Sequence, residues 1–174
     1  MDYKEKLRAF NSTEKYKSEL VLLRSLLRGW DAIYCGKLDY GAGLCKTAYD
    51  LKADAYDVND YKEHSVNYYL DKLPEKHYDY IYFMHSLAHI PNPIEVLKDL
   101  KARYNATITV ITPNAYWLML QGNNEYVPDP TVHKHYTLHE LRELFEEAGY
   151  EVTLIGQFGE LNNGVNERIF LQAR

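Results

Sequence analysis

Cysteine is scarce in this chain, and its scarcity excludes two classes of small protein. The 174 residues include two cysteines, Cys35 and Cys45, and these do not form a C-x-x-C pair. Two thiols are too few for a disulfide framework or for a structural zinc site. The sequence therefore favours a reducing compartment, and we expect a cytoplasmic protein.

Long apolar runs are missing as well. No stretch approaches the roughly 18 apolar residues that a membrane span requires. The first residues are not followed by the apolar segment of a signal peptide. We therefore expect neither a membrane span nor secretion. The oligomeric state stays open, because a single sequence does not separate exposed apolar faces from buried ones.

An excess of positive charge is also absent. The formal net charge is −5, and the isoelectric point is about 5.8. Proteins that bind nucleic acid nonspecifically need clustered lysine and arginine to replace counterions on the phosphates. We therefore expect no nucleic-acid partner.

Predicted strands alternate with predicted helices along the chain. Alternation of this kind indicates an α/β fold with a parallel sheet covered on both faces. The length fits one domain, with residues 1–30 expected as an N-terminal helical cap on residues 31–174. Helices are predicted at 13–28, 46–51, from 92 onward and at 138–148. Strands are predicted to end at 39 and to cover 53–58, 65–70, 78–84, 106–112, 151–155 and 166–172.

Turn and capping residues sharpen some of these boundaries. Asn92 is followed by proline and then by Glu95, and Thr137 is followed by Glu140, so each pattern predicts a helix start. The last two strands are joined by the Gly- and Asn-rich segment 156–164, in which no helix is predicted. We therefore expect these two strands to form an antiparallel pair.

A glycine-rich turn follows the first predicted strand. It reads Asp39-Tyr40-Gly41-Ala42-Gly43-Leu44-Cys45. Glycine lets backbone N–H groups approach a ligand closely. A dinucleotide fingerprint would need a third glycine, G-x-G-x-x-G, which is missing here. The run resembles the D-x-G-x-G-x-G motif of class I S-adenosylmethionine-dependent methyltransferases, with Cys45 in the place of the last glycine.

Three later segments strengthen this resemblance. Asp57 stands where the family places an acid at the end of its second strand. Residues 78–93 are similar to the family's fourth-strand signature, although Ala88 replaces its usual glutamate. Ile111-Thr112-Pro113-Asn114, followed by 135–150, resembles the C-terminal half of small-molecule methyltransferases.

The resemblance implies a three-layer Rossmann-like fold, mostly parallel with a C-terminal antiparallel strand, and S-adenosyl-L-methionine as cofactor. The donor is already activated, so the protein mainly supplies positioning and excludes water. The resemblance implies cofactor contacts from Asp39, Gly41, Ala42 and Gly43 at the methionine end, Asp57 at the ribose, Leu70 and Asp71 at the adenine, and His85 near the methyl group.

Histidines and polar residues supply the acceptor-site candidates. His85 and His89 are the candidate catalytic residues, but the first could simply end a strand and the second could tie down a loop. The spacing of the downstream histidines would also be compatible with a metal site. No nearby carboxylate or thiol completes a ligand set, so we expect no metal. Candidate substrate-binding residues are Asn114, Tyr116, His133 and His135.

The predicted function is methyl transfer to a small-molecule acceptor, with one alternative of another class. Cys45, Ala88 and a connection after Asp57 too short for a helical crossover would also suit a degenerate module that binds without turnover. A base-modifying nucleic-acid methyltransferase is disfavoured, because 85–88 do not match that class's D/N-P-P-Y/W motif. A nicotinamide dehydrogenase is disfavoured by the absent third glycine.

Overall fold

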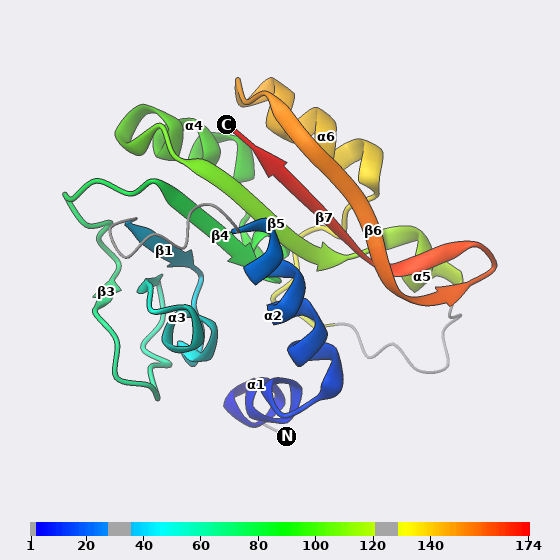
Figure 1. Ribbon diagram of the computed structural model, residues 1–174, viewed down its shortest axis with the longest axis horizontal. Helices are drawn as coiled ribbons and strands as arrows, with labels where there is room; N and C mark the ends of the chain where they lie inside the picture. The colour runs from blue at the N-terminus through cyan, green and yellow to red at the C-terminus, as the bar shows by residue number, and fades with distance from the viewer. Residues whose placement is uncertain (1–2, 28–35, 121–128) are drawn as a thin grey trace. The chain divides into compact units, whose positions relative to one another are not determined.

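The computed structural model describes residues 3–27, 36–120 and 129–174. They form two compact units, Met1–Met84 and His85–Arg174. The expected boundary between a cap and the main domain, at residue 30, lies outside the described residues. The first unit contains α1 (Tyr3–Asn11), α2 (Glu14–Leu26), β1 (Lys37–Tyr40), α3 (Lys46–Leu51), β2 (Asp54–Asp57), β3 (Tyr68–Leu70) and β4 (Tyr80–Met84) (Figure 1).

The strands of the first unit are all parallel, in the order β3-β2-β1-β4. Asp39 pairs in register with Ala55 on one side and with Tyr82 on the other. Side chains alternate between the two faces of a strand. Asp39 and Tyr82 therefore share one face of the sheet, and Tyr40 belongs to the other.

Aromatic packing fixes that second face. The ring of Tyr40 lies 4.8 Å from the ring of Tyr56 and 4.8 Å from that of Phe83, measured between centroids. All three come from the ends of adjacent strands. Buried ring clusters of this kind contribute about 0.5–1.5 kcal/mol per pair beyond the burial of area. These three rings thus stabilise the strand ends from which the glycine turn departs.

The connection from β2 to β3 is residues 58–67, and it contains no helix. The sequence predicted this shortening but left the third strand in doubt. The structure retains the strand as a three-residue segment in parallel register, with Ala55 opposite Tyr68. The Tyr68 hydroxyl donates to the Asn59 carbonyl and so ties the connection to the strand.

Two helices precede the sheet. Thr13 caps α2 by accepting a hydrogen bond from the Tyr16 backbone. Helix α1 is an addition that the apolar pattern did not reveal. It packs at the glycine turn, since a Cβ built at Gly43 would lie 3.2 Å from Leu7 Cδ1. Arg8 forms an ion pair with Glu63 of the β2–β3 connection.

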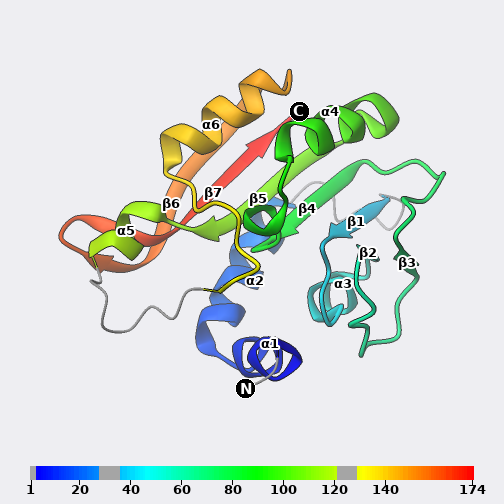
Figure 2. The same cartoon turned by 180° about the vertical axis from the view of Figure 1, so that it is seen from behind.

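The second unit is built on an antiparallel sheet in the order β5-β7-β6. The predicted antiparallel C-terminal pair is therefore confirmed, as is the fold class: α/β, mostly parallel, with an antiparallel C-terminal strand. Helices α4 and α6 lie on the same side of these strands (Figure 2). The elements are η1 (Leu87–His89), α4 (Pro93–Tyr104), β5 (Thr107–Pro113), α5 (Ala115–Leu120), α6 (Leu138–Glu147), β6 (Val152–Asn162) and β7 (Val165–Ala173).

The two predicted helix starts differ in how they are capped. Thr137 and Glu140 form a complete capping box at α6, with each side chain bonded to the other residue's backbone N–H. Asn92 stands at the N-cap of α4, but its side chain makes no capping hydrogen bond. Pro93 at the first helical position therefore does more to begin α4 than the asparagine does.

The Gly- and Asn-rich segment 156–164 was expected as a loop, and that expectation is wrong. Strand β6 continues to Asn162, and the turn consists of Asn163 and Gly164, both with positive φ. Asn-Gly is the preferred pair for a two-residue hairpin turn. The remaining polar residues of the segment lie in a solvent-facing strand, which composition alone does not separate from a loop.

Among the described helices, none is long and apolar enough to cross a membrane.

Candidate functional site

The glycine turn leaves β1 and folds back on β2. The backbone N–H groups of Gly41 and Ala42 both donate to the Tyr56 carbonyl, at 2.8 and 3.0 Å. Gly41 and Gly43 have φ values of 74° and 51°. These left-handed conformations favour glycine, because a Cβ would crowd the following backbone. The predicted cofactor residues Gly41, Ala42 and Gly43 therefore form one tight turn.

Asp57 joins the glycine turn at the end of β2. Its Oδ2 accepts the Gly43 N–H at 2.8 Å, and its Oδ1 accepts the Asn59 N–H at 2.9 Å. The side chain is 7 % exposed. Each carboxylate oxygen accepts more than one hydrogen bond, so both keep capacity for a diol. The sequence pattern did not reveal that this acid also holds the turn in place.

Asp39 is almost fully buried at the end of β1. Its Oδ1 has no hydrogen-bond partner. Burial, and then the negative charge of Asp57, hold the pKa of Asp39 well above its usual range, against a hydrogen bond from the Ala48 backbone. A buried polar oxygen without a partner costs about 1–3 kcal/mol. Such an atom beside a glycine turn suits a ligand that brings an ammonium group.

Tyr82 lies beside Asp39 on the same face of the sheet, and the sequence analysis did not single it out. It is the register partner of Asp39, is 1 % exposed, and its hydroxyl has no hydrogen-bond partner. Burial, followed by the charge of Asp39, raises the pKa of Tyr82. The alternation of side chains along β1 and β4 is the signal that could have identified it.

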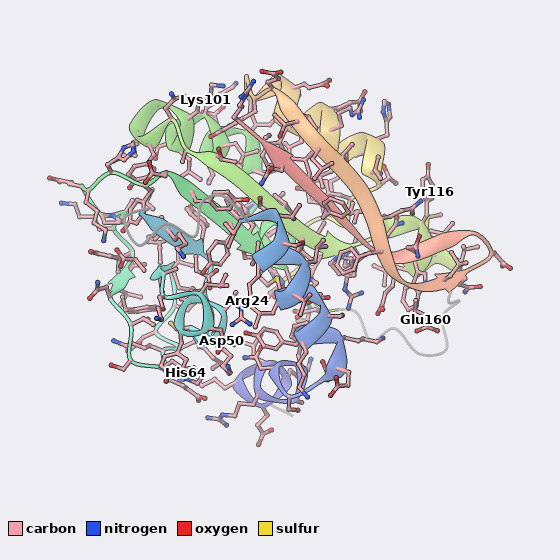
Figure 3. All side chains as sticks on the ribbon, viewed as in Figure 1. Arg24, Asp50, His64, Lys101, Tyr116 and Glu160 are labelled. Carbon is pink, nitrogen blue, oxygen red and sulfur yellow. The ribbon has the colours of Figure 1, made fainter. Side chains whose placement is uncertain are left out.

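Helices α2 and α3 supply a second acidic group in this unit. Tyr16 donates to Asp50 Oδ2 at 2.8 Å, and Lys46 pairs with the same carboxylate. Arg24 donates to the Asp50 carbonyl at 3.2 Å, and both are labelled in Figure 3. The Asp50 carboxylate is therefore already bonded to neighbouring side chains, whereas Asp39 Oδ1 has no hydrogen-bond partner.

The predicted adenine residues lie at the end of β3. Leu70 is 44 % exposed. Asp71 has a φ of 58°, and its N–H donates to the Asp57 carbonyl at 3.1 Å. The strand pairing thus brings Leu70 and Asp71 beside the ribose candidate Asp57. Exposed Leu70 offers an apolar surface suited to one face of a purine.

Cys45 occupies the place of the motif's last glycine. It is fully buried and left-handed, with a φ of 63°. Burial, and then the charge of Asp39, raises the pKa of the Cys45 thiol to about 12. The thiol is therefore neutral and takes no part in charge-based recognition of a ligand.

The candidate catalytic histidines open the second unit. His85 has a φ of 60°, and its N–H donates to the Ile111 carbonyl at 2.8 Å. His89 ends the short helix η1, and its Nδ1 lies 2.8 Å from Thr131 Oγ1. Burial lowers the pKa of His89. The negative charge of Asp129 and a hydrogen bond to the Thr131 backbone oppose this effect, and the charges of His85 and His133 add to it.

The downstream histidines lie near the same short helix. The backbone N–H groups of His133 and Lys134 both donate to the Ala88 carbonyl, at 2.9 and 3.2 Å. Burial, followed by the charge of His89, lowers the pKa of His135. The second unit therefore gathers four histidines that influence one another electrostatically, and at least His89 and His135 are held neutral.

The two other candidate substrate-binding residues, Asn114 and Tyr116, differ in burial and in hydrogen bonding. Asn114 is buried, donates to the Asn166 carbonyl at 3.0 Å, and accepts the Tyr116 N–H at 3.1 Å. It thus caps α5 and joins it to β7. Tyr116 is 56 % exposed and projects from α5, as labelled in Figure 3. A role for either in binding an acceptor stays a prediction.

No group of three or more His, Cys, Asp or Glu side chains within the described ranges is arranged to hold a metal ion. The remaining downstream histidine, His139, lies in the first turn of α6 and pairs with Glu143.

The predicted residues thus form two separate groups. The cofactor candidates of the first unit, from Asp39 to Asp71, meet at the carboxyl ends of β1, β2 and β3. The histidines and Asn114 belong to the second unit. Sequence reasoning missed Thr131, which contacts His89, and Asp129, which accepts from Thr131. An aspartate two residues before a threonine is a typical Asx-turn pattern that could have indicated them.

Comparisons with known proteins identify the family. The model of a family described as "Methyltransferase domain" matches residues 28–155. No curated protein matches the sequence.

Solved structures share the fold at low sequence identity. A protein from Pyrococcus horikoshii OT3 is 16% identical with a TM-score of 0.70, and the match covers 99% of both chains. Magnesium protoporphyrin IX methyltransferase from Synechocystis PCC 6803, solved with bound S-adenosylhomocysteine, is 13% identical with a TM-score of 0.65, covering 91% of this chain and 82% of that one. A S-adenosylmethionine-dependent methyltransferase from Aquifex aeolicus is 16% identical with a TM-score of 0.65, covering 99% and 98%.

These matches confirm the predicted enzyme class and its cofactor, S-adenosyl-L-methionine. The cofactor fits the residues present, because a glycine turn, a buried acid with an unpartnered oxygen and a second acid lie together at one edge of the parallel strands. The chain belongs to the methyltransferase domain family.

Proposed function

We propose that this protein transfers the methyl group of S-adenosylmethionine to a small-molecule acceptor. The observation that carries the proposal is the buried Asp39 carboxyl, whose unpartnered oxygen lies beside a glycine turn held by Asp57. The donor carries a sulfonium and an ammonium. Two acids at one edge of the strands therefore suit its positive charge.

The residues divide the work of binding. Asp39 and the turn Gly41–Gly43 would hold the amino-acid end, Asp57 would accept the ribose hydroxyls, and Leu70 and Asp71 would border the adenine. The cofactor supplies an activated methyl group. The protein then needs only to orient the acceptor, exclude water and remove a proton where the acceptor carries one.

The acceptor side is assigned to the second unit. His85 and His89 are proposed as the catalytic pair, with Asn114, Tyr116, His133 and His135 contributing to acceptor binding. Neutral histidines accept a proton near pH 7, and burial keeps the pKa of His89 below its usual range.

A small-molecule acceptor is favoured over RNA by charge. The net charge of −5 opposes binding to a polyanion. One similar structure is an RNA repair complex containing Hen1, 16% identical with a TM-score of 0.64, in which the match covers 42% of that chain. RNA is therefore the acceptor against which the proposal is tested.

The first experiment measures cofactor binding by calorimetry. Wild-type protein should bind S-adenosylmethionine, and Asp57→Ala should weaken binding at least tenfold, since hydrogen bonds to a charged group contribute about 1.5–3 kcal/mol. Asp60→Ala, an exposed acid of the same connection, is the matched control and should bind normally. Equal binding by all three proteins would overturn the assignment of the ribose site.

The second experiment separates an enzyme from a module that binds without turnover. Methyl-labelled donor is incubated with protein and either a metabolite extract below about 1 kDa or total RNA. Label should move into the small-molecule fraction. Label found in RNA would refute the proposal of a small-molecule acceptor. Tight donor binding without transfer to either fraction would favour a module that binds without turnover. Cys45 in the last glycine position supports that alternative.

A further inference from the structure

His89 is joined to two residues that no sequence motif indicated. Its Nδ1 lies 2.8 Å from Thr131 Oγ1. The same Oγ1 lies 2.7 Å from Asp129 Oδ1. Asp129 Oδ1 also accepts the Thr131 backbone N–H at 2.9 Å. The three side chains therefore form one continuous chain of hydrogen bonds.

The chemistry of these groups fixes where the hydrogens lie. An ionised carboxylate only accepts hydrogen bonds, and a hydroxyl has one hydrogen to donate. The Thr131 hydroxyl must therefore donate its one hydrogen bond to Asp129. The contact between Thr131 and His89 then requires Nδ1 of the imidazole to be the donor.

A neutral imidazole carries one N–H only. If Nδ1 holds it, Nε2 keeps its lone pair and is the basic atom of the ring. Burial lowers the pKa of His89, so the neutral ring is the form present near pH 7. The contact with Thr131 Oγ1 is made by Nδ1, so this contact does not occupy the lone pair of Nε2.

The backbone holds the two segments together independently of these side chains. His133 and Lys134, which follow Thr131 closely, donate to the carbonyl of Ala88, the neighbour of His89. The His89 N–H donates to the Ser86 carbonyl at 3.0 Å. Thr131 and His89 are therefore presented to each other by fixed backbone.

We propose that Asp129 and Thr131 are positioning residues that lock His89 in the tautomer protonated at Nδ1, so that Nε2 acts as the base toward an acceptor that arrives with a proton on its hydroxyl or ammonium group. The catalytic role of Nε2 rests on the proposed function. The assignment of the tautomer rests only on the hydrogen bonds described above.

The step balances as follows. The acceptor's O–H or N–H bond breaks as its proton moves to His89 Nε2. The electron pair left on the heteroatom forms the new bond to the methyl carbon, and the carbon–sulfur bond of the donor breaks with its pair remaining on sulfur. The imidazolium afterwards returns the proton to water.

The test reads the tautomer directly from nitrogen chemical shifts of the histidine rings in the full-length protein, with His89 assigned by comparison with His89→Gln. In the wild type, His89 Nδ1 should show a protonated shift and Nε2 an unprotonated one. Thr131→Val and Asp129→Ala should abolish this bias, and Thr131→Ser should retain it. Thr153→Val, an exposed threonine whose hydroxyl donates to the Gln172 carbonyl, is the matched control and should leave His89 unchanged.

A wild-type ring protonated at Nε2, or a Thr131→Val spectrum identical to the wild type, would overturn the inference. Neither result depends on donor or acceptor, so it would leave the proposed function standing. Should labelling identify an acceptor, Thr131→Val should lower kcat about tenfold with little change in KM, because it alters the base and not the binding surface. A change confined to KM would contradict the positioning role.

Discussion

At the scale of single residues, the candidate site contains two buried polar side chains that lower the stability of the fold. Asp39 and Tyr82 face each other across β1 and β4, both almost fully buried and each with an oxygen that lacks a hydrogen-bond partner. Residues held at a cost to stability tend to serve function. Substitution of Asp39 tests this view.

Replacing Asp39 by asparagine should stabilise the protein at neutral pH. The pKa of Asp39 is raised in the folded state, so above about pH 4 the unfolded chain has released a proton that the fold retains. The contribution of Asp39 to stability is thus fully present below about pH 4 and is lost as pH rises toward the folded pKa. Asp39→Asn should be more stable by about 1 kcal/mol at pH 7–8, and the difference should vanish toward pH 4.

Urea unfolding at the two pH values checks this prediction. The same variant should bind S-adenosylmethionine more weakly than the wild type. Asp99→Asn, an exposed acid of α4, is the control and should change neither quantity by a comparable amount. A variant less stable than the wild type at pH 8 would contradict the burial argument.

Cys45 should resist alkylation in the folded protein. With a pKa of about 12, the thiol is almost entirely protonated at pH 8, and the thiolate is the reactive form. In a Cys35→Ser background, iodoacetamide should modify Cys45 at least a hundredfold more slowly in the native protein than in urea, as followed by mass spectrometry. Equal rates would show that the turn opens readily.

At the scale of elements, the capping box of α6 gives the most direct test. Thr137→Ala removes the hydroxyl that accepts the Glu140 N–H, and it should destabilise the protein by about 1 kcal/mol. Thr137→Ser keeps the hydroxyl and should recover most of the loss in urea unfolding. If alanine and serine behave alike, the cap does not limit the stability of the second unit.

The helices and strands also show which elements the sequence could predict and why it missed others. The β-branched run of β5, the capping box of α6 and the glycine turn are local patterns, and the structure places each where its residues indicate. Helix α1 was missed because its approach to the glycine turn, where Leu7 lies near Gly43, is a tertiary contact. The extension of β6 was missed because polar residues of a solvent-facing strand resemble those of a loop.

The candidate site residues also divide into those that local patterns indicated and those that depend on tertiary contacts. Asp39 and Asp57 were predicted because strand ends are marked by the chain itself. Tyr82 and Thr131 were not, because one depends on the register between strands and the other on two loops meeting through the Ala88 carbonyl. Contacts made only by folding leave no trace in local spacing.

At the scale of the whole molecule, binding of product should stabilise the fold by mass action. S-adenosylhomocysteine at about a hundred times its Kd should add about 2.7 kcal/mol, which for a domain of this size raises Tm by about 5–10 °C. Asp57→Ala should show less than half of this shift in scanning calorimetry, while Asp60→Ala should match the wild type. A shift of equal size in Asp57→Ala would remove that acid from the site.

The short connection between β2 and β3 has a consequence for nucleobase selectivity. Residues 58–67 contain no helix and lead into β3, whose last residue, Leu70, is exposed. A purine beside Leu70 would therefore be only partly enclosed on this side. Recognition of the donor would then rest on its sugar and its amino acid. Synthetic donors with bulky groups on the base should therefore be accepted nearly as well as the natural one.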